Sequence, residues 1–368
     1  MKDLGNLKYF LGIEVLRSKK GIFISQRKYV LDLLTETGML NYKPADTPMV
    51  MNHGLQIIEG KKMVDQTRYQ RLVGKILYLS HTRPDLAYAA GVVSRFMHKP
   101  QEQHLEVVYK ILRYLKGSPR KGVIFRNHGH LNLHAFTDAD WGGDRDSRKS
   151  TSGYFTLVGG NLVTWKNKRQ KVVSMSSAEA EFRGIAKGVT EVLWLRKLLS
   201  ELGYTPKKSC KLYCDNMASI WISENPVQHD RTKHVEIDRH FIKDNLEEKV
   251  ISLPFVRSED QLADILTKAV TTHAFEGALS KLARTSAEAE VLAIREGLLL
   301  ALKYTPPKLE IETEADAVRE LLMNVEDNLS HEFGVVIVDV ANLIDCPWIC
   351  ELKHAGRKAN KVAHGQNW

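Results

Sequence analysis

Four acidic residues in the middle of the sequence have the types and positions expected of a metal-binding site. Asp138 ends one predicted strand, and Asp215 ends another. If these strands are neighbours in one sheet, the two carboxylates meet at the same edge. Glu181 lies on a predicted helix, and Asp264 lies early in the last predicted helix of this region, from where it can point back at that edge.

Carboxylates that converge repel one another unless a cation lies between them. Because Mg²⁺ and Mn²⁺ prefer oxygen ligands, the four acids predict one of these ions as cofactor and two-metal hydrolysis of a phosphodiester. Each of the aspartates alone also has a structural explanation. Asp138 and Asp140 could shape a turn, Asp215 could cap the next helix, and Asp264 could favour its helix N-terminus.

The elements that must position these acids are predicted to alternate between strands and helices. Ser176 and Glu179 form a capping-box pattern at the start of a long helix that ends before Gly203, which explains Glu179 and leaves Glu181 without a structural role. The predicted strands lie at residues 131–138, 153–158, 162–174 with one interruption, 211–215 and 250–256, and the later helices at 232–246 and from about residue 260. The order is three strands, helix, strand, helix, strand and helix, which predicts an α/β fold.

The rest of the composition indicates a globular protein of two or three units. The chain has 368 residues, of which 43% are hydrophobic and 26% charged. It contains no apolar stretch of about 18 residues for a membrane span, and no secretory signal at its start. Its four cysteines are too few for a disulfide framework, so we expect a reducing, intracellular compartment, cytoplasm or nucleus. We interpret them as small buried residues.

Net positive charge is concentrated in the first third of the chain. Residues 1–130 hold 22 Lys and Arg against 10 Asp and Glu, whereas residues 271–368 hold 10 against 15. A basic segment favours a polyanionic partner such as nucleic acid, because its cations replace the counterions of the phosphates. The alternative is that these cations only solubilise helix faces.

Residues 131–270 resemble the ribonuclease H domain of copia-type retrotransposon polyproteins. The resemblance is carried by TDADW at 137–141, DSRKSTSGY at 146–154, SSAEAEF at 176–182, YCDN at 213–216, RTKH at 231–234 and EDQLADILTK at 259–268. It implies a ribonuclease-H-like fold, a mixed sheet with flanking helices. It also implies cleavage of the RNA strand of an RNA/DNA hybrid, and metal-binding roles for Asp138, Glu181, Asp215 and Asp264. Asp140 is an alternative to Asp138 as the first of these metal ligands, because alternation along a strand points both side chains to the same side.

Residues 1–130 resemble the stretch that follows the polymerase active site in the same polyproteins. The matching segments are MKDLGNLKYFLGIEV at 1–15, YQRLVGK at 69–75 and TRPDLAY at 82–88. The resemblance would place the Tyr-x-Asp-Asp polymerase signature upstream of Met1, and the chain contains no Asp-Asp pair. We therefore expect a thumb and connection remnant without polymerase activity.

Residues 271–368 contain a partial repeat of the sequence pattern seen in residues 131–270. The sequence SAEAE recurs at 177–181 and 286–290, each time before an apolar helical pattern. The copy resembles the ribonuclease-H-like domain common in plant proteins of retroelement origin. Too few residues precede its helix for three strands, and it has His364 where the last acid belongs, with Glu314 or Asp316 as the strand acid. We expect this domain to be inactive.

Three functions compete for this sequence. The first is a metal-dependent endonuclease of the ribonuclease H class, and the second is a non-catalytic nucleic-acid-binding remnant. Integrase-like chemistry is the third, but it would place its glutamate after both aspartates, whereas Glu181 lies between Asp138 and Asp215. A zinc site at His229, His234 and His240 is not expected, because no cysteine pair completes it.

Overall fold

The computed structural model describes residues 7–18, 21–224, 233–282, 308–313 and 349–354. The chain divides into two compact units. One comprises Met1–Pro44, Leu115–Ile124 and Ala283–Trp368, and the other comprises Ala45–Tyr114 and Phe125–Leu282. The second unit joins residues from both sides of position 130, so the division at residues 130 and 270 stays a prediction.

The first unit contains short strands from near the start of the chain. Its four-stranded sheet has the order β1-β2-β3-β4, followed in sequence after β3 by helix α1. The bounds are β1 Tyr9–Phe10, β2 Ile13–Ser18, β3 Gly21–Ser25, α1 Arg27–Glu36 and β4 Gly122–Arg126. Two further strands, β10 Lys308–Thr313 and β11 Ile349–His354, pair in parallel. The predicted helices of the second copy and its residues Glu290, Glu314, Asp316 and His364 lie outside the described residues.

The second unit begins with helices whose apolar residues recur at helical spacing. They are α2 Gln66–Leu79, α3 Ala87–Ser94 and α4 Glu102–Gly117. In α2, Asp65 caps the N-terminus by accepting a hydrogen bond from the backbone N–H of Arg68 at 3.1 Å. Helix α4 ends at Gly117, and glycine is a residue type favoured at helix ends.

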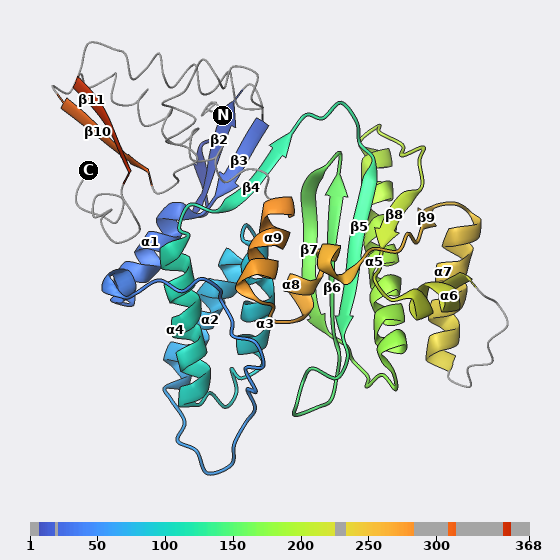
Figure 1. The fold of residues 1–368 in the computed structure, drawn as a ribbon, viewed down its shortest axis with the longest axis horizontal. Helices are drawn as coiled ribbons and strands as arrows, with labels where there is room; N and C mark the ends of the chain where they lie inside the picture. The colour runs from blue at the N-terminus through green and yellow to red at the C-terminus, as the bar shows by residue number, and fades with distance from the viewer. Residues whose placement is uncertain (1–6, 19–20, 225–232, 283–307, 314–348, 355–368) are drawn as a thin grey trace, which may run out of the picture. The chain divides into compact units, whose positions relative to one another are not determined.

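The sheet of the second unit is mixed and five-stranded, with the order β7-β6-β5-β8-β9 (Figure 1). Strands β5, β6 and β7 form an antiparallel meander, whereas β8 and β9 run parallel to β5. The bounds are β5 Leu133–Asp140, β6 Thr151–Val158, β7 Asn161–Arg169, β8 Cys210–Tyr213 and β9 Ile251–Ser252. With its flanking helices, this sheet confirms the predicted ribonuclease-H-like fold class.

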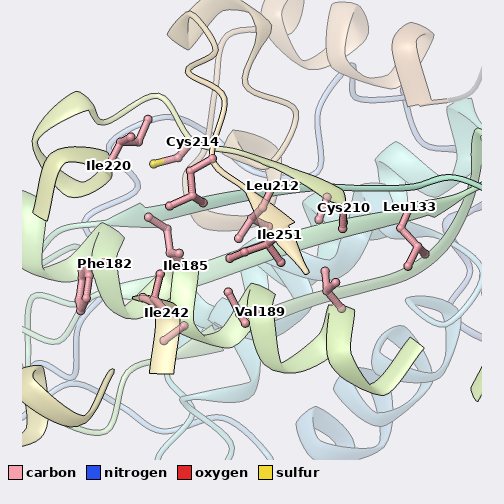
Figure 2. Packing of buried hydrophobic residues seen from close by; sticks show 14 of the residues in the cluster. Leu133, Phe182, Ile185, Val189, Cys210, Leu212, Cys214, Ile220, Ile242 and Ile251 are labelled. Atoms are coloured by element: carbon pink, nitrogen blue, oxygen red, sulfur yellow. The ribbon is translucent and has the colours of Figure 1, made fainter. Parts of the chain in front are cut away.

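The long helix α5, Ser177–Glu201, packs on one face of this sheet. Its N-terminus is capped by Ser176, whose hydroxyl accepts a hydrogen bond from the Glu179 backbone N–H at 3.1 Å. Gly188 allows a close approach, because a Cβ there would lie 2.5 Å from Cγ2 of Thr137 on β5. Figure 2 shows the apolar core between this helix and the sheet, in which Ile185, Val189 and Leu212 are buried.

The structure differs from the sequence prediction at three places. A short helix, α6 Met217–Glu224, was not predicted between β8 and α7 Lys233–Glu247. Residues 171–174 are not a strand, since β7 ends at Arg169. The last predicted helix is instead a 3₁₀ turn at Ser258–Asp260, a four-residue helix α8, Asp264–Thr267, and a separate helix α9, Thr272–Leu282.

Candidate metal centre

Three of the four predicted acids meet at one edge of the five-stranded sheet. Carboxylate oxygens of Asp138, Asp215 and Asp264 all lie within 4.8 Å of one another. Asp138 is near the end of β5, Asp215 follows the neighbouring parallel strand β8, and Asp264 begins α8. The juxtaposition expected from parallel strand ends is therefore present, and we call these residues together with Glu181 the acid cluster.

Asp138 is held in place by the sheet and by α8. The residue is 2% exposed, and it pairs in register with Gly153 of β6. The hydroxyl of Thr267 donates a hydrogen bond to its Oδ2 atom. A Cβ at Gly153 would lie 2.6 Å from Cβ of Leu266, so the missing side chain lets α8 approach the sheet and bring Asp264 to Asp138.

Glu181 reaches the same edge from the first turns of α5. One of its carboxylate oxygens lies within 4.8 Å of both Sγ of Cys214 and a carboxylate oxygen of Asp215. The side chain is buried, and its Oε2 atom has no hydrogen-bond partner among the described residues. Burial, followed by the charge of Asp138, raises the pKa of Glu181 well above its usual range. A buried carboxylate oxygen without a partner is costly unless a cation or a proton compensates it.

Among the described residues, Asp215 accepts a side-chain hydrogen bond and Asp264 forms an ion pair. The hydroxyl of Ser258 donates to Oδ2 of Asp215 at 2.7 Å, and Nζ of Lys268 lies 2.9 Å from Oδ1 of Asp264. Burial and the charge of Asp138 raise the pKa of Asp264. Burial alone would lower the pKa of Lys268, but Asp138 and Asp264 raise it, so Lys268 supplies one fixed positive charge to the acid cluster.

Asp140 lies outside both groups of potential metal ligands found among the described residues. It ends β5 and is half-buried. Burial, then the negative charge of Asp138, raises its pKa to about 6. The position of its side chain favours Asp138 as the first ligand, although the assignment itself stays a prediction.

The donor set of the acid cluster fits a hard divalent cation. Its carboxylate oxygens are the ligands that Mg²⁺ and Mn²⁺ prefer, and the unpartnered oxygen of Glu181 is available for such an ion. Cys214 is close enough to be a ligand, but burial raises the pKa of its thiol. A protonated thiol is a poor metal ligand, so the acids alone would hold the ion.

Sequence reasoning missed the residues that support the acids. Gln261 is buried, and its side-chain amide donates to the backbone oxygen of Thr137 at 3.0 Å, which ties the segment before α8 to β5. Thr267 and Lys268 contact the acids directly. A signal was present, because Lys268 lies four positions after Asp264, the spacing of neighbours on a helix.

The other residues considered as ligands do not join a site in the described part of the chain. His229 is outside that part, His240 is exposed on α7, and neither potential ligand group contains a histidine. Cys210 and Cys214 are buried free thiols, as interpreted from the sequence. No helix among the described residues combines the length and hydrophobicity needed to cross a membrane.

Comparison with known proteins connects the chain to transposon polyproteins. A family model described as "Reverse transcriptase-like" matches residues 262–365. The chain is 43% identical, over 77% of its length, to the Retrovirus-related Pol polyprotein from transposon RE1 of Arabidopsis thaliana, of which it covers 19%. It is 39% identical, over 53% of its length, to an uncharacterized mitochondrial protein of the same plant, of which it covers 80%.

A solved structure of LC11-RNase H1 in complex with an RNA/DNA hybrid is also similar. It shares 15% identity over 40% of this chain and all of that chain, with a TM-score of 0.29. The present chain spans about a fifth of the length of the transposon polyproteins that it matches. By sequence, the chain belongs to the copia-type family of retrovirus-related Pol polyproteins of plant transposons.

Proposed function

We propose that this chain is a metal-dependent endonuclease that cleaves the RNA strand of RNA/DNA hybrids. The observation that carries the proposal is the acid cluster, in which three aspartate carboxylates lie within 4.8 Å of one another. Such a concentration of negative charge is stabilised by a cation or by bound protons, and a cation held by carboxylates suits phosphodiester hydrolysis. The resemblance of residues 131–270 to a ribonuclease H domain supports an RNA/DNA hybrid as substrate.

Asp138, Glu181, Asp215 and Asp264 would hold Mg²⁺ or Mn²⁺ in this function. When bound, the ions would supply the positive charge that activates water and stabilises the leaving oxygen. The oxygen of a water molecule forms a bond to phosphorus as the bond to the 3′ oxygen breaks, leaving a 3′-hydroxyl and a 5′-phosphate. Thr267 and Gln261 would serve as positioning residues, because they fix Asp138 and the segment before α8.

The arrangement of the acids supports ribonuclease H chemistry over integrase-like chemistry. In the sequence, α5 with Glu181 comes after the strand that carries Asp138 and before the strand that leads to Asp215. Glu181 reaches the shared edge from the N-terminal part of this helix. No polymerase activity is part of the proposal, because the chain contains no Asp-Asp pair.

Cleavage of a labelled RNA/DNA hybrid by the purified chain tests this proposal. We expect product with Mg²⁺ or Mn²⁺ and none with EDTA, and we expect Asp215→Asn to abolish turnover. Asp244→Asn is the matched control, because Asp244 is a carboxylate on α7 outside the acid cluster. Circular dichroism establishes that both variants are folded.

Two results would contradict the proposal in different ways. Equal rates for the parent chain and Asp215→Asn would remove Asp215 from the site. Tight binding of hybrid without cleavage under any metal condition would instead support the non-catalytic nucleic-acid-binding function.

A further inference from the structure

Three lysines lie together on the face of the sheet that α5 covers, at its β7 edge. Lys168 of β7 pairs in register with Ser152 of β6, and Lys166 pairs with Tyr154. Residues that pair directly across antiparallel strands have Cβ atoms about 5 Å apart on the same face. From α5, Nζ of Lys187 donates a hydrogen bond to Oγ of Ser152 at 3.2 Å. Lys168 and Lys187 therefore both lie beside Ser152.

No carboxylate of the described residues pairs with these lysines. Among the described residues, none of the three forms a salt bridge, whereas Arg183, one turn before Lys187 on α5, is paired with Glu179 at 2.8 Å. The acidic residues near these lysines do not neutralise them. Glu191 accepts the Tyr154 hydroxyl at 2.6 Å, and Asp238 on α7 only partly offsets the effect of the cations on Lys187.

Ser152 adds an unpaired donor at the same place. Its Oγ atom accepts hydrogen bonds from Lys187 and, at 2.8 Å, from Nε2 of Gln170. A hydroxyl has two acceptor lone pairs and one hydrogen to donate, and this hydrogen has no acceptor among the described residues. Ser152 is 3% exposed, so leaving its donor unpaired is unfavourable. The group is therefore rich in hydrogen-bond donors.

The lysines of β7 alone could be explained as charges that protect an edge strand from pairing with other chains. That explanation does not extend to Lys187, which lies on α5, is half-buried and points at Ser152. Burial and the charges of Lys168 and Arg183 lower the pKa of Lys187 to about 8, so the site holds this cation at an electrostatic cost. A bound anion would offset that cost.

We propose that Lys166, Lys168 and Lys187 form a phosphate-binding site for the backbone of a nucleic acid. The site lies near the acid cluster, because Ser152 also pairs with Ala139, the residue after Asp138. Strand β7 is two strands away from β5, a lateral distance of about 10 Å. A duplex at the acid cluster is long enough to pass over both places. The identity of the ligand rests on the proposed function, but the site is separate from the four acids.

Salt-dependent binding tests this site without requiring catalysis. A fluorescein-labelled RNA/DNA hybrid is titrated with the full chain in Ca²⁺ or EDTA, and anisotropy gives the affinity at several KCl concentrations. Each lost phosphate contact should reduce the slope of log K against log salt by about 0.9, which is roughly eightfold in affinity at ~0.1 M salt. We expect the slope of log K against log salt to fall in magnitude by about one for Lys187→Gln. For the double variant that combines Lys166→Gln with Lys168→Gln, we expect it to fall by about two.

Matched variants separate a specific site from a general effect of charge. Lys207→Gln removes one charge from an exposed lysine elsewhere in the same unit and should leave the slope unchanged. Lys187→Arg keeps the charge and should restore most of the affinity. The double variant at β7 changes two side chains of an edge strand, so it keeps the proposal testable even if Lys187→Gln fails to fold.

The outcomes distinguish this site from the proposed function. A reduced slope in a chain that cleaves no hybrid would support the site and overturn the nuclease. Normal cleavage with unchanged slopes in the Lys166, Lys168 and Lys187 variants would overturn the site alone. Equal slopes in these variants and in Lys207→Gln, or no binding of hybrid by the parent chain, would also overturn the site.

Discussion

Replacing Asp140 with asparagine would stabilise the metal-free protein at neutral pH and would identify the first acid of the cluster. Asp140 is half-buried at the end of β5. Burial and the charge of Asp138 raise its pKa from 3.8 to about 6, although Lys268 and Arg95 act in the opposite direction. An asparagine side chain has nearly the same shape as that of aspartate and carries no charge.

The expected gain in stability follows from the difference between the pKa of Asp140 in the folded chain and its ordinary value. A rise of about two units corresponds to roughly 3 kcal/mol at ~1.36 kcal/mol per unit. Since Asp140 is only half-buried, screening by solvent reduces this to roughly 1.5 kcal/mol. A carboxyl whose pKa is raised on folding contributes stability below its unfolded pKa, and this contribution is lost as the pH rises through the folded pKa. The parent chain therefore loses stability between pH 3.8 and about 6 that Asp140→Asn keeps.

Urea unfolding in EDTA, followed by tryptophan fluorescence, measures the effect. At about pH 4 the variant and the parent should have similar free energies of unfolding, and at about pH 7.5 the variant should be more stable by roughly 1.5 kcal/mol. Asp244→Asn controls for the loss of one charge. The same difference between variant and parent at both pH values would refute the raised pKa of Asp140.

Adding Mn²⁺ to the same samples decides between Asp138 and Asp140. If Asp138 is the first ligand, Mn²⁺ raises the melting temperature of the parent and of Asp140→Asn equally, because a ligand that binds only the folded state stabilises it. In Asp138→Asn that increase should be lost. An increase that disappears in Asp140→Asn and persists in Asp138→Asn would assign the role to Asp140.

Two further predictions concern packing and domain organisation. Gly153→Ala should destabilise the protein by roughly 1–3 kcal/mol, because the new Cβ would overlap α8. Gly74→Ala should instead stabilise α2 by roughly 1 kcal/mol, because a Cβ there meets no atom within 4 Å. Urea unfolding of both variants measures these changes, and equal effects on the free energy of unfolding would contradict the packing argument. Truncation after Leu282 should leave hybrid cleavage per mole of folded protein unchanged. It keeps Phe275 of α9, whose ring centroid lies 5.8 Å from that of Tyr114, and cleavage by isolated residues 283–368 would show that the second copy holds an active site.

The sequence predicted the elements whose signals are local. The start of α5 followed from the capping pattern at Ser176, and its end followed from Gly203, which has a positive φ of 86°. The meeting of Asp138 and Asp215 followed from strand order, because neighbouring parallel strands end at one edge. The roles of these acids stay predictions, since geometry brings carboxylates together without demonstrating a reaction.

Elements that depend on tertiary contacts were missed. Val172 and Val173 suggested a strand, but both are exposed, and the turn after β7 is held by the buried side chain of Gln170, which accepts the Ser174 hydroxyl at 2.9 Å. Helix α6 did have a local signal, because Oδ1 of Asn216 accepts the backbone N–H of Ser219 at 3.0 Å as a helix cap.

The secondary structure of the segment around Asp264 could not be predicted from the periodicity of its apolar residues. Gln261 binds the backbone of Thr137 and also accepts the backbone N–H of Ala263 at 3.1 Å. These bonds separate the 3₁₀ turn from α8, so Asp264 starts a new helix instead of continuing one. The contact to Thr137 joins residues 124 positions apart, and a pattern within one segment carries no information about such a contact.

The electrostatics of the acid cluster link metal binding to proton release. Lys268 offsets part of the negative charge by its contact with Asp264 at 2.9 Å, and the raised pKa values of Glu181 and Asp264 show that the folded chain favours holding protons there without a cation. A metal ion needs deprotonated carboxylates, so its binding must displace those protons. Affinity for Mg²⁺ or Mn²⁺ should consequently weaken as the pH falls, for a reason that lies in the closeness of the acids and not in any one of them.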